Sequence, residues 1–175
     1  MKVLILNGSP HKKGNTSFIA EKIKEVYAFE SDTCYAYDIK DPCRDCKKCF
    51  EGESCSIEDE FTQILANIDT YDAIVVATPL YYNQPTGSML SLLSRFQFFY
   101  GTNKKPKEKK AVIVVTGGGG SVVNSADAEK TLRIALMSVN AKVTAYIRSL
   151  NTDSIKAWDD ETLTEQIRAL DDIIF

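Results

Sequence analysis

The residues best suited to chemistry are four cysteines that stand close together in a polar stretch. They have the spacing Cys-x2-Cys-x2-Cys-x5-Cys, at Cys43, Cys46, Cys49 and Cys55. Thiolates at this spacing can bind one tetrahedral metal ion or one 4Fe–4S cluster. Three alternatives stay open: a 4Fe–4S cluster, a zinc ion, or free and redox-active thiols. The fifth cysteine, Cys34, lies in an expected strand and is predicted to be a small buried hydrophobic residue.

A second group of candidate residues is the polar loop that follows the first apolar run. It reads Asn7-Gly8-Ser9-Pro10-His11-Lys12-Lys13-Gly14-Asn15-Thr16-Ser17 and leads into a helical pattern. The N-terminus of that helix offers free N–H groups and a positive dipole end, which together favour a phosphate. The predicted phosphate contacts are Ser9, His11, Asn15, Thr16 and Ser17. His11, the only histidine, could also meet an incoming nicotinamide nucleotide or remain a solvated loop residue.

Other phosphate-binding patterns do not match this loop. The residue after Gly14 is Asn15, whereas a Walker A loop needs lysine there, and the dinucleotide pattern Gly-x-Gly-x-x-Gly is absent. A phosphatase nucleophile would need a cysteine after the first strand, and a receiver domain would need acidic residues in place of Asn7. The loop therefore predicts a phosphate site of a different kind.

Two later loops offer a surface for a flat ring. The loop Thr78-Pro79-Leu80-Tyr81-Tyr82-Asn83-Gln84-Pro85-Thr86-Gly87 presents two tyrosines for stacking, with Asn83 for a polar edge. The loop Thr116-Gly117-Gly118-Gly119-Gly120-Ser121 allows close backbone approach, and its N–H groups would favour negative charge on a reduced flavin.

The elements that must position these loops follow from the apolar patterning. Continuously apolar or β-rich runs predict five strands, at 3–6, 33–37, 73–77, 111–115 and 142–147. Helical periodicity predicts five helices. They begin near Asn15, after a capping box at 56–59, at 87 (running to 100), at 128 (running to 139), and after Asp159 or Asp160. Strands that alternate with helices predict an α/β fold, a doubly wound parallel sheet with helices on both faces. The three loops would then meet beyond the carboxyl ends of the strands, where such sheets bind ligands.

Length and charge narrow the class of protein. A chain of 175 residues, 44% hydrophobic and 26% charged, fits a single domain over 1–175, with a cysteine-rich loop at 41–56. The net charge of −3 argues against a nucleic-acid partner. No apolar run reaches the roughly 18 residues of a membrane helix, and the first apolar run is too short for a signal peptide, so we expect a cytoplasmic protein without a membrane partner. The lysine-rich run at 104–110 is predicted to be a solvated loop, and Trp158 to pack against the last helix.

The loop motifs together resemble the flavodoxin-like NAD(P)H-dependent FMN reductase family. The resemblance is carried by Leu6-Asn7-Gly8-Ser9-Pro10 with Gly14-Asn15-Thr16, by Thr78-Pro79-Leu80-Tyr81-Tyr82, and by Thr116-Gly117-Gly118, in order along nearly the whole chain. It implies a flavodoxin-like five-stranded sheet of order 2-1-3-4-5 and a homodimer or higher homo-oligomer. It also implies one FMN per chain, with phosphate contacts from the first loop named above and with ring contacts from Pro79, Leu80, Tyr81, Tyr82, Asn83, Thr116, Gly117, Gly118 and Gly119. The cysteine pattern resembles that of the iron–sulfur flavoproteins, a branch of the same superfamily in which a cluster passes electrons to FMN.

The preferred hypothesis is an FMN-dependent NAD(P)H oxidoreductase. Hydride would pass from the nicotinamide nucleotide through FMN to a quinone, a flavin, a nitro compound or another small-molecule or protein acceptor. No side chain is named as catalytic, because the cofactor supplies the chemistry. One alternative is an iron–sulfur electron carrier with the four cysteines as ligands, and another is a flavin-binding module without turnover.

Overall fold

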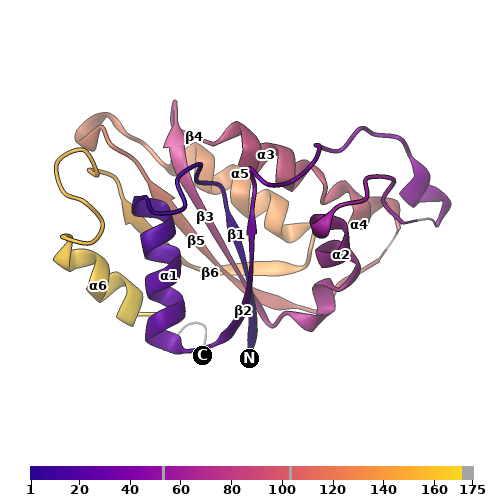
Figure 1. Cartoon of the computed structure of the whole chain (residues 1–175), viewed down its shortest axis with the longest axis horizontal. Coiled ribbons are helices and arrows are strands. Elements are labelled where there is room, and N and C mark those ends of the chain that lie inside the picture. Colours follow the sequence, from indigo (N-terminus) through magenta and orange to yellow (C-terminus); the bar gives the residue numbers. More distant parts are fainter. Residues whose placement is uncertain (53, 103, 171–175) are drawn as a thin grey trace.

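The central feature of the fold is a parallel sheet of five strands. The computed structural model describes residues 1–52, 54–102 and 104–170. The parallel strands are β1 (Lys2–Asn7), β2 (Glu30–Tyr35), β3 (Ala73–Tyr81), β5 (Lys109–Thr116) and β6 (Ala141–Ser149), in the order β2-β1-β3-β5-β6 (Figure 1). A short sixth strand, β4 (Gln84–Pro85), pairs antiparallel with β3. The predicted strand order is confirmed, with β4 as an addition.

Helices cover both faces of this sheet, as predicted (Figure 1). One face carries α1 (Asn15–Tyr27) and α6 (Glu161–Arg168). The other carries α2 (Glu60–Ala66), α3 (Gly87–Ser94), α4 (Gln97–Gly101) and α5 (Ala126–Met137). Three single turns of 3-10 helix are η1 (Lys48–Glu51), η2 (Ile68–Thr70) and η3 (Gly120–Val122).

The apolar runs form central strands because both of their faces are buried. In β1, Val3 and Ile5 pack into the core under α1 and α6, whereas Leu4 and Leu6 pack into the core under α2 to α5. Successive side chains of a strand point to opposite faces, so a strand covered on both sides needs an apolar residue at every position. This explains why β1, β3 and β5 read as unbroken apolar runs.

Two predicted element boundaries were wrong, one at the end of β3 and one in the helical segment that follows β4. The strand expected to stop at Thr78-Pro79 continues to Tyr81, because Leu80 and Tyr81 pair with β4. The single helix expected at 87–100 is two helices, α3 and α4, which are separated at Arg95 and Phe96. The side chain of Arg95 is turned inward and buried there, as described below.

One predicted helix cap differs in the structure. The N-cap of α2 is Asp59, whose Oδ1 accepts the N–H of Thr62 at 2.9 Å, so the expected capping box at Ser56 does not form. The N-cap of α1 is Gly14, which offers no side chain, and Asn15 is already in the helix. Asp160 does cap α6, as predicted, by accepting the N–H of Thr162.

Two further predictions on single segments need correction. The lysine-rich run is not wholly a solvated loop, since β5 begins at Lys109, whose buried ammonium donates to Asp69 Oδ1 at 3.3 Å. Burial lowers the pKa of Lys109. Trp158 is half exposed and lies edge-on to Phe18 of α1, with ring centroids 6.0 Å apart, rather than packing against the last helix.

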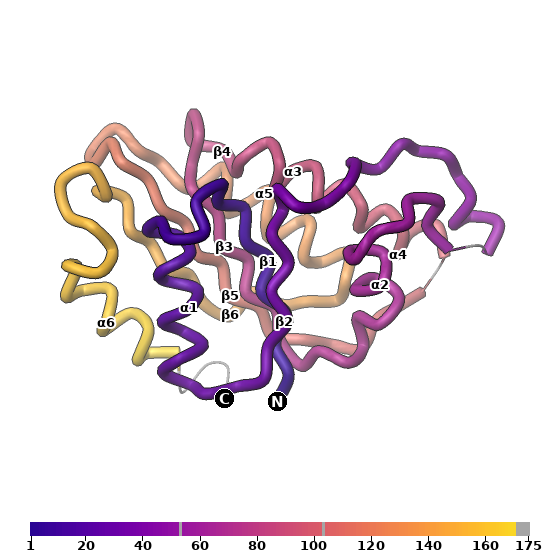
Figure 2. The backbone as a smooth tube through the Cα atoms, viewed as in Figure 1, coloured from indigo at the N-terminus to yellow at the C-terminus, as the bar shows by residue number. Residues whose placement is uncertain are grey.

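The cysteine-rich loop is the long excursion from this architecture. In Figure 2 it runs from the end of β2 to the side of the molecule that carries α2 and α4, away from α6. Gly101 of α4 packs directly against Cys49 and Phe50 of η1, so closely that a side chain at that position would collide with the cysteine sulfur. In the described part of the chain no helix is long and apolar enough to cross a bilayer.

Candidate functional site

Three loops converge at the carboxyl end of the sheet. The backbone N–H of Gly8 donates to Ala77 O at 2.7 Å, and the hydroxyl of Thr86 donates to Gly8 O at 2.9 Å. Pro79 of β3 is paired in register with Thr116 of β5. The phosphate-loop residues, the aromatic loop and the glycine loop are therefore neighbours, as the predicted topology required.

The N-terminus of α1 is open to an anion. No side chain caps it, and its first turn contains no acidic residue. The first N–H groups of a helix lack partners inside the helix, and the helix dipole adds positive potential at that end. The backbone at Asn15, Thr16 and Ser17 is thus suited to bind a phosphate without a cationic side chain.

The hydroxyls predicted to contact phosphate are engaged within the protein. Ser9 and Ser17 both donate to the carbonyl oxygen of His11, at 3.1 and 2.9 Å, and Ser17 also accepts from Asn7 Nδ2 at 3.0 Å. Asn15 Oδ1 accepts the N–H of Ala157 at 2.9 Å. His11 itself is exposed. In this arrangement the side chains shape the loop, and the uncapped N–H groups remain as donors to an anion.

The aromatic loop forms the tip of a hairpin between β3 and β4. Tyr82 and Asn83 have φ angles of 54° and 62°, the positive values of a two-residue type I′ turn. Tyr82 is fully exposed, Tyr81 is about half exposed, and Pro79 and Leu80 are partly buried. Asn83 Oδ1 accepts the N–H of Asn124 at 3.0 Å, which ties the tip to the segment after the glycine loop. The tyrosines thus offer free aromatic surface beside the sheet end.

The glycine loop is held by the segment that follows β6. Gly117 donates its N–H to Ser149 O at 2.9 Å and accepts the N–H of Thr152 at 2.9 Å, so its own N–H is not available to a ring. In the described chain, the N–H groups of Gly118 and Gly119 have no partner. A Cβ at Gly118 would lie 2.5 Å from the carboxylate oxygens of Asp153, so a larger residue there would have to displace that exposed side chain. Sequence reasoning missed this segment, because it has no periodicity and no motif.

These features fit FMN as a cofactor. An uncapped helix start suits its phosphate, and exposed tyrosines with free glycine N–H groups suit its ring. The hydroxyls of Thr16 and Thr116 lie 2.6 Å apart and join the phosphate loop to the glycine loop. The residues that would hold the phosphate and the ring are therefore part of one connected surface.

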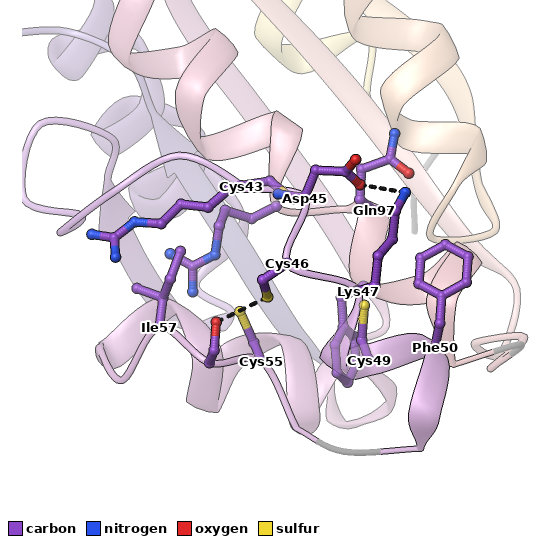
Figure 3. A pocket seen from close by; sticks show the side chains of 13 residues that line it. Cys43, Asp45, Cys46, Lys47, Cys49, Phe50, Cys55, Ile57 and Gln97 are labelled. Carbon is purple, nitrogen blue, oxygen red and sulfur yellow. Dashed lines mark hydrogen bonds and ion pairs between the residues drawn. The ribbon is translucent and has the colours of Figure 1, made fainter.

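The four clustered cysteines line one cavity, which we call the cysteine pocket. It has a volume of about 30 Å³, and Cys43, Cys46, Cys49 and Cys55 all line it (Figure 3). Cys46 Sγ lies 3.1 Å from Ser56 Oγ, a hydrogen bond that lowers the pKa of this thiol, while burial raises that of Cys49. Within the described ranges, no three potential ligands are gathered closely enough to hold a metal ion. The donor set suits an iron–sulfur cluster or zinc, but the sulfurs are not assembled around a centre.

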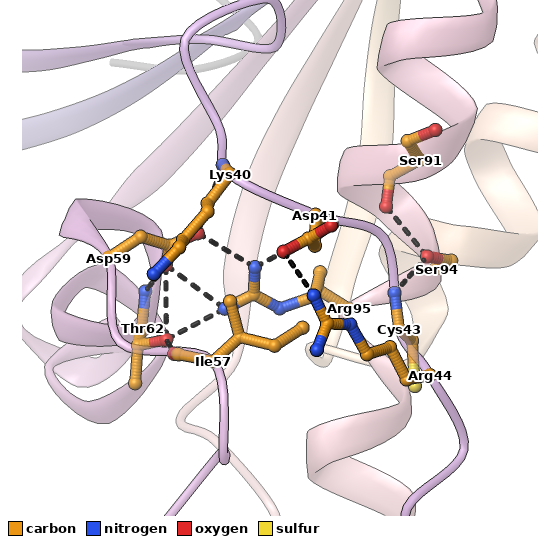
Figure 4. Close-up of polar contacts among 10 residues, drawn as sticks. All are labelled: Lys40, Asp41, Cys43, Arg44, Ile57, Asp59, Thr62, Ser91, Ser94 and Arg95. Carbon is orange, nitrogen blue, oxygen red and sulfur yellow. Dashed lines mark hydrogen bonds and ion pairs between the residues drawn. The ribbon is translucent and has the colours of Figure 1, made fainter.

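One buried cation beside this pocket was not predicted. Arg95, in the break between α3 and α4, forms a two-pronged ion pair with Asp59, with N···O distances of 2.9 and 3.0 Å (Figure 4). It also donates to Asp41 O at 3.1 Å and to Thr62 Oγ1 at 2.7 Å. The helical pattern could not reveal this contact, since a single arginine in an amphipathic run is usually on the solvent face. Cys34, by contrast, is buried as predicted, and burial raises its pKa to about 12.

Comparison with known proteins identifies the family. The chain matches the NADPH-dependent FMN reductase family over residues 1–151. This protein belongs to that family. The matched residues include all three loops at the sheet end as well as the cysteine pocket. Both candidate sites of this FMN reductase family member therefore lie in the part of the chain that matches the family.

Curated relatives of this family member include iron–sulfur flavoproteins. One from Archaeoglobus fulgidus is 38% identical over 101 residues, which is 54% of this chain and 48% of the relative. One from Methanosarcina thermophila is 29% identical over 99 residues, which is 54% of this chain and 52% of the relative. The chain thus spans about half the length of the curated relatives it matches.

Solved structures show the same fold. The apo form of an NADH:FMN oxidoreductase superposes with a TM-score of 0.63 at 19% identity, covering 96% of this chain and 84% of the other. An azoreductase from Bacillus anthracis superposes with a TM-score of 0.64 at 14% identity, covering 97% and 96%. At these identities the likeness establishes the flavodoxin-like fold of this family member and nothing finer.

Proposed function

We propose that this protein is an oxidoreductase that uses bound FMN to pass reducing equivalents from NADH or NADPH to a second acceptor. The observation that carries the proposal is the uncapped start of α1, joined through Thr16 and Thr116 to the glycine loop. Membership of the NADPH-dependent FMN reductase family supports it. When bound, FMN supplies the chemistry of hydride acceptance and onward transfer.

The chain's own contribution is binding and orientation. The N–H groups at Asn15, Thr16 and Ser17 would hold the phosphate, and Tyr81 and Tyr82 would cover the ring. The free N–H groups of Gly118 and Gly119 would stabilise negative charge on the reduced ring. No side chain is needed as a nucleophile or general base.

The finer parts of this proposal concern partners. We expect the acceptor to be a quinone, a flavin, a nitro compound or a protein, and the protein to be a cytoplasmic homodimer or higher homo-oligomer. The net charge of −3 is consistent with an absence of nucleic-acid binding.

The test is a turnover assay on protein loaded with FMN. Steady oxidation of NADH or NADPH with a quinone or a nitro compound is expected, following ping-pong kinetics. Tight FMN binding with no turnover on any of these acceptors would instead favour a flavin-binding module. The protein without FMN is the matched control, since it should oxidise neither nucleotide.

A second candidate function, an iron–sulfur electron carrier, is favoured by the cysteine pocket. All four cysteines face one cavity, and the relative from Archaeoglobus fulgidus is named an iron–sulfur flavoprotein. Protein purified without oxygen would then contain iron and show a broad absorbance that dithionite bleaches. Cys46→Ser should remove the iron and slow electron entry, whereas a plain FMN reductase would keep its turnover. Cys34→Ser is the control, because Cys34 lies outside the pocket.

A further inference from the structure

All but one of the N–H donors of the Arg95 guanidinium have hydrogen-bond partners among the described residues. An arginine has five N–H donors. Four of them can be accounted for by Asp59, Thr62 and the carbonyl oxygen of Asp41 (Figure 4). The fifth, on Nε, is buried and has no hydrogen-bond partner among the described residues. An unpaired buried donor is costly, so its presence calls for a partner that binds there.

The open side of Arg95 belongs to the cysteine pocket. Arg95 is 2% exposed and lines the cavity together with the four cysteines. Burial acts to lower the pKa of its guanidinium, but Asp59 and, more weakly, the sulfur of Cys55 raise it above its ordinary value. A permanent positive charge therefore lines the pocket beside the sulfur of Cys55.

Such a charge matters most for a sulfur-ligated metal centre. Thiolate ligands bring negative charge into a cavity that is partly shielded from water, where uncompensated charge is costly. Hydrogen bonds to the sulfurs and the net charge nearby are what set the reduction potential of iron–sulfur clusters. The neighbouring Arg44 and Lys47 have exposed side chains, so solvent screens them more strongly.

We propose that Arg95 is the positioning residue of the cysteine pocket: its Nε–H donates to a ligating sulfur, that of Cys55, when the four cysteines hold an iron–sulfur centre. This inference rests on the second candidate function above. Asp59 and Thr62 fix the plane of the guanidinium, and so aim the free N–H. Loss of that N–H would make the bound centre harder to reduce.

The test compares variants of protein reconstituted without oxygen with iron and sulfide. Arg95→Lys keeps the charge but loses the Nε–H and the planar fork. Asp59→Asn keeps Arg95 but removes the negative charge behind it. Arg133→Lys, on the exposed face of α5, is the matched control. The readouts are iron content, the free energy of unfolding in urea, and the oxidised-to-reduced ratio of the iron chromophore at a fixed potential.

The expected result is a change of opposite sign in the two variants. The oxidised-to-reduced ratio should rise about tenfold in Arg95→Lys, which for one electron is about 59 mV, and should fall in Asp59→Asn. Arg133→Lys should match the wild type. If Arg95→Lys fails to fold, the expected decrease of the oxidised-to-reduced ratio in Asp59→Asn is the remaining test.

Two other outcomes overturn the proposal in distinguishable ways. If both variants lose stability but the ratio does not move, Arg95 has only a structural role, and the iron–sulfur function stands without it. If the wild-type protein takes up no iron, the iron–sulfur function fails, and the inference about Arg95 fails with it.

Discussion

The hydroxyl of Thr16 lies 2.6 Å from that of Thr116, although a hundred residues separate them in the chain. The first belongs to the opening turn of α1 and the second ends β5. Both residues are buried, so the bond is shielded from water. It couples the loop proposed to hold the phosphate of FMN to the loop proposed to meet its ring.

Removal of either hydroxyl should weaken FMN binding. In Thr16→Val or Thr116→Val, one hydroxyl is left buried without its partner, at a cost of about 1–3 kcal/mol in the free energy of unfolding. We expect the dissociation constant for FMN to rise by roughly tenfold, or about 1.4 kcal/mol. Urea denaturation and flavin-fluorescence titration measure the two effects. The double variant should cost less than the sum of the singles; strict additivity would mean that the two loops are not coupled.

A negative charge at the start of α1 should act in opposite directions on folding and on binding. Asn15→Asp keeps the oxygen that accepts the N–H of Ala157, but adds a carboxylate to the first turn. The charge should stabilise the helix by about 0.3–1 kcal/mol through the dipole. It should also repel the phosphate and weaken FMN binding by at least tenfold. Gln63→Glu, exposed on α2, is the control. Unchanged affinity in Asn15→Asp would remove α1 as the phosphate site.

The ion pair of Asp59 and Arg95 should make the free energy of unfolding depend on pH. Burial acts to raise the pKa of Asp59, but hydrogen bonds and charge from Arg95 outweigh it, so the pKa falls from 3.8 to about 2. Because the pKa of Asp59 is lower in the folded state than in the unfolded state, its ionised carboxylate stabilises the fold at pH values above the unfolded-state pKa. This stabilisation is lost as the pH falls from about 4 toward 2. At 1.36 kcal/mol per pKa unit, the acid-sensitive part is about 2 kcal/mol. About half of this, ~1 kcal/mol, is lost between pH 6 and pH 3. Urea denaturation at the two pH values should therefore show a loss of stability that is smaller by about that amount in Asp59→Asn than in the wild type.

The cysteines should differ in reactivity once any bound metal is removed. Cys34 is buried with its pKa raised to about 12, so it should resist iodoacetamide at pH 8 until the protein unfolds. Cys46 is exposed with a lowered pKa, whereas burial raises that of Cys49. Mass spectrometry should find Cys46 modified before Cys49. Early labelling of Cys34 in the folded protein would contradict its burial.

The sequence by itself determined the sheet and the loops that carry the site. A strand covered on both faces must be apolar at every position, so the runs at 3–6, 73–77 and 111–115 could be recognised without any partner. Their alternation with helices then required the parallel order and brought the loops at 7–17, 78–87 and 116–125 to one edge. The cysteine spacing marked four thiols of one short segment as a candidate site, and it left open whether they hold a cluster, a zinc ion or neither.

Only the tertiary structure decided how those loops are held. The bond between Thr16 and Thr116 and the contact of Gly118 with Asp153 join segments that are far apart in the chain and carry no local signal for one another. Arg95 is the sharpest case: an arginine in an amphipathic run is expected on the solvent face, but the structure buries it against Asp59. Apolar periodicity reports which face of an element is buried. It does not report which polar partners long-range packing will place inside, because those depend on the positions of elements far away in the chain.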